Sequence, residues 1–216
     1  MNKIKAISLT AFIIISVVFV VFLYEKRQLK PQESEKLYVE QDKKNDIKLA
    51  ENPKEPIINF KQRITKKPFG IYVSPLSSPV KPEHFKGFHT GVDIEYEDTN
   101  QEVPVYSVSD GHVVYSDKVS GYGGVLVLRQ KINGKEYLVL YGHLNPSSLV
   151  SRGRSVTRGE RIAILGQGFS PQTDYERKHL HFGIIASGKI DFRGYVQKKE
   201  ELSNWIDPQS INFSNQ

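Results

Sequence analysis

The chain has no cysteine among its 216 residues. This absence excludes a disulfide framework, and it also excludes a lipid-modified cysteine as a membrane anchor. The absence of cysteine does not indicate whether the protein lies in an oxidising or a reducing compartment. Any metal site in this protein must therefore be built from histidine and carboxylate ligands rather than from thiolates.

Residues 66–216 also lack a concentrated positive charge, although the net charge of the whole chain is +6. Residues 1–65 hold 12 Lys and Arg against 8 Asp and Glu, whereas residues 66–216 hold 18 against 16. A nucleic-acid reader concentrates basic residues in its folded domain, and no binding motif of that class is present. We therefore expect no nucleic-acid partner.

Helical periodicity is the third absence, since no useful run between residues 70 and 190 shows it. Short β-rich runs alternate there with turn residues, which predicts an all-β domain of antiparallel sheet in a barrel or sandwich. The turn Asn133-Gly134-Lys135 predicts a hairpin between two of these runs. The runs are GVDIEY, VPVYSVSDGHVVYS, GGVLVLRQ, KEYLVLYGHL, ERIAILGQG and HLHFGIIASG.

One long apolar run is present near the N-terminus. Residues 6–24 (AISLTAFIIISVVFVVFLY) carry no charge over 19 residues, which matches the hydrocarbon thickness of a bilayer at about 1.5 Å per residue. A cleaved signal peptide has a shorter apolar region and a small-residue cleavage site, which this run lacks. We expect residues 1–24 to be an uncleaved transmembrane signal anchor. Lysines and arginines on both sides of the run leave its orientation undecided.

The next segment, residues 25–65, is rich in Lys, Glu, Gln, Asp and Asn and has little to bury. This composition predicts a solvated tether between the anchor and a domain over residues 66–216. The alternative is that part of it, such as residues 34–48, forms a polar helix.

Four of the six histidines fall into three short patterns: His89-Thr-Gly-Val-Asp93, Tyr-Gly-His143-Leu, and His179-Leu-His181. Residues two or four apart in a strand point to the same face. His179 and His181 therefore share a face, and His89 and Asp93 do so if their segment is extended. Two such pairs that face each other place up to four ligands around one point.

Any one of these patterns is more often structural than metal-binding, and we interpret His84 and His112, which lack a partner pattern, as structural. The co-occurrence of all three patterns in one cysteine-free domain favours a metal site. A catalytic zinc site has three protein ligands and an open position, so two of the five candidates stay uncoordinated. The residues alone do not say which two. A closed structural site of four ligands is the alternative.

These motifs resemble the lysostaphin-type zinc endopeptidases, also called LytM-type or duplicated hybrid motif domains, which are mainly β and act on peptidoglycan. The likeness covers about residues 69–211. It rests on H-x-x-x-D in FHTGVDI, H-x-H in HLHF and the histidine of YGHL. It also rests on the phrases VYSVSDGHVVY, SGYGGVLVL, GRSVTRGERIAILG and NWIDP.

The resemblance implies specific roles. His89, Asp93 and His181 would bind one Zn²⁺ per domain, and His143 and His179 would be the uncoordinated catalytic histidines. His179 is our choice for the general base, with His143 orienting water or stabilising the oxyanion, and the two roles are interchangeable. The implied reaction is hydrolysis of a peptide bond by zinc-activated water.

One segment departs from the family pattern. Residues 169–178 (FSPQTDYERK) replace the Gly- and Ser-rich turn that commonly leads into H-x-H. The substitute is bulkier and charged, and we expect it to border the cleft and to alter substrate choice.

Two functions from different classes follow. The first is a peptidoglycan endopeptidase, anchored in the bacterial cytoplasmic membrane by one helix, with its catalytic domain on the cell-wall side. The second is a non-catalytic membrane-tethered scaffold or activator of other cell-wall hydrolases. The retained set of five candidate site residues favours the enzyme.

Overall fold

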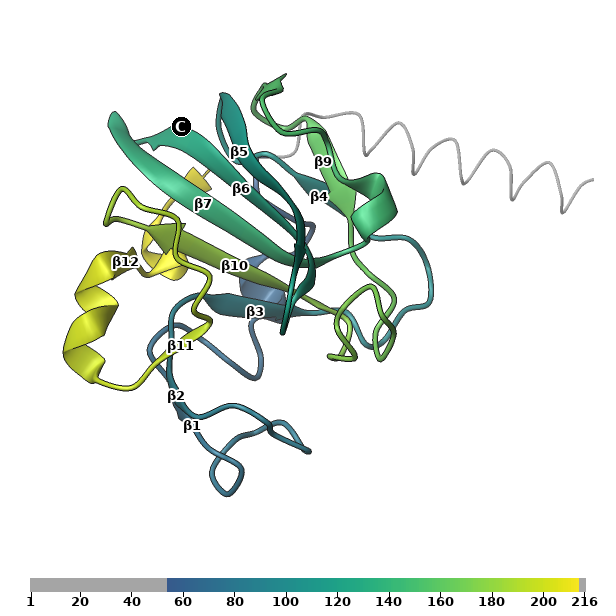
Figure 1. Cartoon of the computed structure of the whole chain (residues 1–216), viewed down its shortest axis with the longest axis vertical. Helices are drawn as coiled ribbons and strands as arrows, with labels where there is room; N and C mark the ends of the chain where they lie inside the picture. The colour runs from purple at the N-terminus through teal and green to yellow at the C-terminus, as the bar shows by residue number, and fades with distance from the viewer. Residues whose placement is uncertain (1–53, 214–216) are drawn as a thin grey trace, which may run out of the picture. The chain divides into compact units, whose positions relative to one another are not determined.

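The computed structural model describes residues 54–213, and β-strands make up most of its regular structure (Figure 1). The largest sheet has the strand order β12-β10-β7-β6-β5-β8, and β3 pairs with the free part of the β10 edge. All of its pairings are antiparallel. Its strands are β3 (Val92–Glu95), β5 (Gly111–Val119), β6 (Gly123–Ile132), β7 (Lys135–Leu144), β8 (Ser155–Val156), β10 (His179–Ile185) and β12 (Trp205–Ile206).

The predicted hairpin is confirmed at the centre of this sheet. Ile132 of β6 faces Lys135 of β7, so Asn133 and Gly134 alone form the turn. Both have positive φ, 49° and 78°, which a two-residue turn of the I′ type requires and which Asn-Gly adopts readily. The turn thereby fixes the register of the two longest strands.

Within residues 54–213, two smaller sheets accompany the large one, and their strands are interleaved with its strands along the chain. The first has the order β1-β2-β11, and the second pairs β4 with β9. These strands are β1 (Tyr72–Val73), β2 (Gly87–His89), β4 (Pro104–Tyr106), β9 (Arg161–Ile164) and β11 (Tyr195–Val196). The described part of the chain also has four short 3₁₀-helices: η1 (Lys61–Arg63), η2 (Pro146–Ser148), η3 (Lys199–Asn204) and η4 (Pro208–Ser210). Residues 54–213 contain no α-helix, which confirms the predicted mostly antiparallel β-fold.

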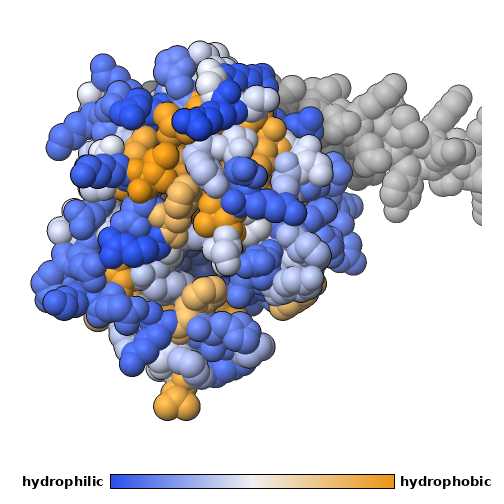
Figure 2. Space-filling model, viewed as in Figure 1, coloured by the Kyte–Doolittle hydropathy of each residue, from blue (hydrophilic) through white to orange (hydrophobic). Residues whose placement is uncertain are grey.

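The core lies on both faces of the large sheet. Leu126 and Leu128 of β6 join one buried apolar cluster, while the alternate residues Val125 and Val127 join another. This alternation is the period of two that a strand imposes on its side chains. Figure 2 shows one face of the domain as mostly polar, with apolar patches over the large sheet.

Part of the segment that the composition predicts to be a tether, residues 25–65, packs into the core of the domain. Ile57 and Phe60 are fully buried in the first cluster. The Phe60 ring packs edge-on against Phe182 of β10 at 5.8 Å and against Phe213 at 5.7 Å. A short apolar group within a polar segment carries no periodic signal, so only the tertiary contacts reveal its burial.

The predicted transmembrane anchor (residues 1–24) and residues 25–53 of the predicted tether lie outside the described residues. Within residues 54–213, no helix combines the length and the apolar character needed to cross a bilayer.

We expect Phe60→Ala to lower the free energy of unfolding by about 3–5 kcal/mol, because it leaves a cavity beside Phe182 and Phe213. Ile58→Ala is the matched control, since Ile58 is 45% exposed and should change stability by about 0.5 kcal/mol or less. Chemical denaturation of the full-length chain in detergent compares them. Equal effects of the two changes would show that residues 57–60 are not part of the core.

Candidate metal centre

The pairing of β3 with β10 brings the predicted site residues together. His181 of β10 lies opposite Asp93 of β3, and His179 lies opposite Glu95. Leu180 and Phe182, which alternate with the histidines, are fully buried in the apolar core. The H-x-H motif therefore presents both imidazoles on one face of the sheet, as the period of a strand predicts.

Three buried donor atoms meet at this edge. His89 Nε2 lies 3.1 Å from His181 Nδ1, and Asp93 Oδ1 lies 3.2 Å from each of these nitrogens. A tetrahedral ion with bonds of about 2.0–2.1 Å separates its ligand atoms by about 3.3 Å, so the triangle has the size that zinc requires. Two imidazoles and one carboxylate are also a donor set that zinc accepts. The three residues can hold a metal ion.

Two more histidines lie beside the three donors. The rings of His143 and His179 are 4.2 Å apart between centroids. His179 Nδ1 lies 2.8 Å from the carbonyl oxygen of Arg177, and His143 Nδ1 lies 3.3 Å from that of Thr173. A carbonyl only accepts, so each Nδ1 carries the proton and each Nε2 keeps its lone pair in the neutral ring.

Burial sets the protonation of both rings. It lowers the pKa of His143 to about 3. Burial, together with the Arg177 guanidinium, holds the pKa of His179 well below its usual range. Both imidazoles are therefore neutral near pH 7 and can accept a proton.

His143 also has an unusual backbone, with φ of 60° at the end of β7. A non-glycine residue in this region costs on the order of 1 kcal/mol and needs support from its surroundings. The carbonyl of His143 accepts a hydrogen bond of 2.9 Å from Gly166 N, and this bond supports the unusual backbone conformation.

Tyr122 is a site residue that sequence reasoning missed. Its ring centroid lies 5.2 Å from both His143 and His181, and its buried hydroxyl has no hydrogen-bond partner among the described residues. Burial raises the pKa of the phenol, so the hydroxyl keeps its proton. The only signal was the phrase SGYGG, which the family likeness marked as framework. Gly123 is required beside it, because a Cβ there would lie 1.8 Å from Gln172 O.

Charged residues around the donors were also missed. Arg177, only 3% exposed, contacts Asp93 Oδ2 at 2.6 Å and Glu95 at 2.8 Å. Burial alone would raise the pKa of Asp93, but His89, His179 and Arg177 hold it well below its usual range. Asp93 is therefore an anion, as a metal ligand must be.

A second buried ion pair supports His89. Lys67 Nζ lies 2.5 Å from Glu83 and donates a 2.9 Å hydrogen bond to the Tyr195 hydroxyl. The Tyr195 ring stacks on His89 with centroids 5.1 Å apart. No local sequence pattern relates Lys67, Glu83 and Tyr195.

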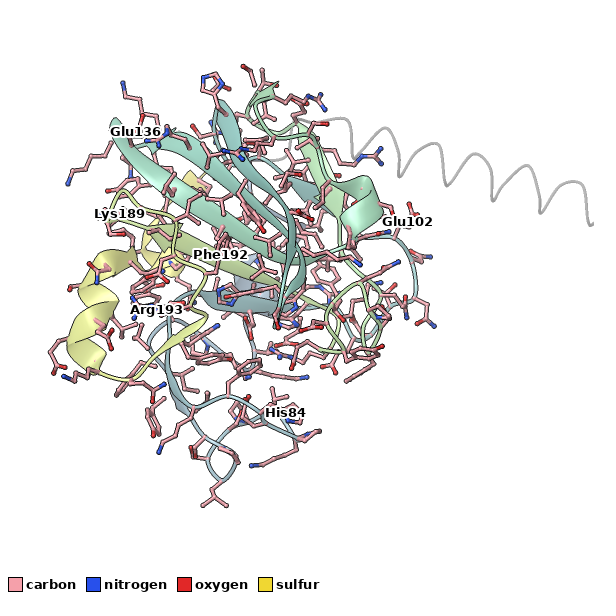
Figure 3. The ribbon with its side chains drawn as sticks, viewed as in Figure 1. His84, Glu102, Glu136, Lys189, Phe192 and Arg193 are labelled. Carbon is pink, nitrogen blue, oxygen red and sulfur yellow. The ribbon has the colours of Figure 1, made fainter. Side chains whose placement is uncertain are left out.

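The centre opens into a cleft of about 280 Å³. Asp93, His143, His179 and His181 lie at its wall together with Tyr122. Phe192 and Arg193, which also line the cleft, are labelled in Figure 3 near the segment that leads into β11. Of the two histidines interpreted as structural, His112 contacts Ser155 at 3.0 Å and is exposed. Neither His112 nor His84 lines the cleft.

Comparison with known proteins gives the family. Residues 87–192 match the profile of Peptidase family M23. These residues form an M23 peptidase domain. The match contains all five predicted site residues and Tyr122.

Three curated relatives resemble the M23 domain. The uncharacterized lipoprotein YgeR of Escherichia coli is 32% identical over 99 residues, 45% of this chain and 35% of YgeR. The murein hydrolase activator EnvC of E. coli is 42% identical over 85 residues, 39% of this chain and 18% of EnvC. The peptidoglycan DD-endopeptidase ShyA of Vibrio cholerae is 31% identical over 105 residues, 45% of this chain and 23% of ShyA. The chain thus spans about a third or less of these relatives.

The solved structure of LytU is 27% identical, with a TM-score of 0.44, and the match covers 68% of this chain and 81% of that one.

We expect Lys67→Met to lower the free energy of unfolding by about 3–5 kcal/mol, because it leaves Glu83 buried without its cation. The neighbouring Lys66→Met should cost about 1 kcal/mol or less, since the Lys66 side chain is 34% exposed. Denaturant unfolding of the full-length chain at pH 7 compares the two.

The pH dependence gives a second check on this pair. Burial would raise the pKa of Glu83, but the bonds from Lys67 and Ser78 lower it below 4.5. Its contribution is therefore present above pH 4.5 and lost as the pH falls through the folded-state pKa. Lys67→Met should weaken this pH dependence, and an unchanged profile would contradict the assignment.

Proposed function

We propose that the M23 domain is a zinc-dependent endopeptidase that hydrolyses peptide bonds in the cross-links or stem peptides of bacterial peptidoglycan. The observation that carries the proposal is the convergence of three groups at one open cleft. These groups are the three metal donors, two neutral histidines with an unprotonated Nε2, and a buried phenol that has no hydrogen-bond partner among the described residues.

The proposed ligands are His89, Asp93 and His181. Zinc bound there would lower the pKa of a water molecule and polarise the peptide carbonyl. The triangle of donors leaves His143, His179 and Tyr122 outside it, and all three line the same cleft. Metal binding, proton transfer and stabilisation of the oxyanion can therefore be carried out by different residues.

His179 is proposed to take the proton from the attacking water. Its Nδ1 is held by the short bond to the Arg177 carbonyl, at 2.8 Å, whereas the corresponding bond of His143 is 3.3 Å long. The tighter bond fixes the direction of Nε2, which a general base requires. His143 would orient the water and pass a proton to the leaving amine.

Tyr122 is proposed to stabilise the oxyanion. Its hydroxyl is buried, protonated and without a partner, which is the condition of a donor reserved for a charge that develops during reaction. A buried hydroxyl without a hydrogen bond lowers the stability of the protein, and a role in binding the substrate during the reaction would explain why it is kept.

The substrate and location are part of the same proposal. Similarity to a peptidoglycan DD-endopeptidase and to a lipoprotein supports a role in the cell envelope. Residues 1–24 would anchor the chain in the cytoplasmic membrane, the following polar residues would act as a tether, and the domain would face the cell wall.

A non-catalytic activator of other cell-wall hydrolases is the second candidate. The 42% identity to the murein hydrolase activator EnvC over 85 residues favours it. An activator needs no metal. Two results together would establish this candidate instead: the wild-type protein leaves all peptidoglycans intact, and the His181→Ala variant still supports cell division.

We expect His181→Ala to lose bound zinc and hydrolytic activity together, because it removes one of three ligands. His143→Ala and His179→Ala should keep zinc and lower kcat/KM by about 10²–10⁴-fold, the usual range for an acid–base group. Metal analysis and release of fragments from purified peptidoglycan measure both quantities on the full-length chain. A metal-free His143→Ala or His179→Ala protein would overturn the ligand assignment.

Tyr122→Phe isolates the phenol. It should keep zinc and stability and lower kcat by about 10²–10³-fold, as loss of one oxyanion donor does. Tyr115→Phe is a matched control, because its hydroxyl contacts the Lys118 carbonyl on the exposed part of β5. Wild-type kcat in Tyr122→Phe would exclude the role.

A further inference from the structure

Arg177 is a buried cation in direct contact with Asp93, one of the proposed metal ligands. It lies within the unusual 169–178 segment, and its side chain is 3% exposed. One terminal nitrogen lies 2.6 Å from Asp93 Oδ2 and 2.8 Å from Glu95 Oε1, and Nε lies 3.0 Å from Glu95 Oε2. The guanidinium is thus fixed between two carboxylates.

The two oxygens of Asp93 consequently have different surroundings. Oδ1 lies 3.2 Å from His89 Nε2 and 3.2 Å from His181 Nδ1. Oδ2 faces Arg177 at 2.6 Å, with His179 Nε2 farther away at 3.5 Å. Only one oxygen of this carboxylate belongs to the donor triangle.

Glu95 keeps the guanidinium in place. It lies two residues after Asp93 on β3, so both side chains project to the same face of the strand. The fork of an arginine bonds a carboxylate at two points, which a lysine cannot do. The charges of Arg177 and Glu95 also cancel, so the trio keeps the single negative charge that Asp93 offers to a cation.

We propose that Arg177 is a positioning residue of the metal centre: with Glu95 it holds Oδ2 of Asp93, so that this ligand binds zinc through Oδ1 alone. The inference rests on the proposed metal site. A carboxylate free at both oxygens can rotate or bind through both, and the second mode occupies the coordination position that the substrate water needs.

The same residue also orients His179, because its backbone carbonyl accepts the His179 Nδ1 hydrogen at 2.8 Å. The side chain of Arg177 thus fixes a ligand while its main chain fixes the proposed base. Movement of Arg177 would disturb both groups together.

Zinc affinity of the full-length chain, measured by competition with a chromophoric chelator, tests the proposal. Arg177→Met should weaken zinc binding by about 10–100-fold, the usual effect of losing a partner of a metal ligand. Simple charge repulsion predicts the opposite sign, because this change removes a cation near the metal. Tighter or unchanged binding would therefore overturn the proposal.

A second variant separates positioning from folding. Arg177→Met leaves Glu95 buried without its partner, whereas Arg177→Met combined with Glu95→Gln removes that unpaired charge. The double variant should regain stability and keep the weakened zinc binding. Recovery of wild-type affinity in the stable double variant would show that Arg177 acts only on the fold.

The cobalt-substituted protein gives a readout that a structural role would not change. If Asp93 gains a second metal bond in Arg177→Met, the coordination number rises and the visible absorption of Co²⁺ becomes weaker. Arg129→Met is the matched control, because it breaks an exposed pair with Glu136, 2.7 Å long, outside the cleft. An identical spectrum in Arg177→Met and wild type would overturn the proposal.

The proposed function fails in a different way. If the wild-type protein binds neither zinc nor cobalt, both the proposed metal site and the positioning role of Arg177 are wrong. If wild type binds zinc and Arg177→Met binds it equally well, only the positioning role falls.

Discussion

The antiparallel pairing of β3 with β10 is the constraint on which the site depends. Its register places Asp93 opposite His181 and Glu95 opposite His179. A shift of β10 by one residue would turn His179 and His181 toward the apolar core and expose Leu180 and Phe182. Burial of Phe182 against Phe60 and Tyr141 therefore protects the register, and the core holds the chemistry in place.

The centre concentrates ionised groups where water is scarce, and two internal ion pairs offset the resulting cost. Arg177 lies between Asp93 and Glu95, and Lys67 lies against Glu83. A buried charge without a partner costs several kcal/mol, so replacing any one of these residues alone destabilises the fold. The arrangement leaves the donor oxygen of Asp93 free of cations, while His143 and His179 remain neutral and able to accept protons.

The parts of the site that could be predicted from the sequence are those with a local signature. The spacing of His179 and His181, the Asn133-Gly134 turn and the alternation of β6 follow from geometry within one strand or one hairpin. The contact between Arg177 and Glu95 joins residues 82 positions apart, and no period marks it. The burial of Phe60 could not be predicted for the same reason, since its partners Phe182 and Phe213 lie far along the chain.

The 169–178 segment shows how one departure from a family pattern can have two consequences. Inward, its groups support the centre: Gln172 O accepts Gly124 N, Asp174 Oδ2 accepts Gly121 N, and the Thr173 carbonyl faces His143. Outward, Phe169 and Tyr175 are about two-thirds exposed, at 68% and 64%. Because the inner contacts are made by other residues of the segment, the side chains of Phe169 and Tyr175 can vary without moving the metal donors. The exposed side chains of this loop and the register of β3 and β10 are therefore held by separate sets of contacts.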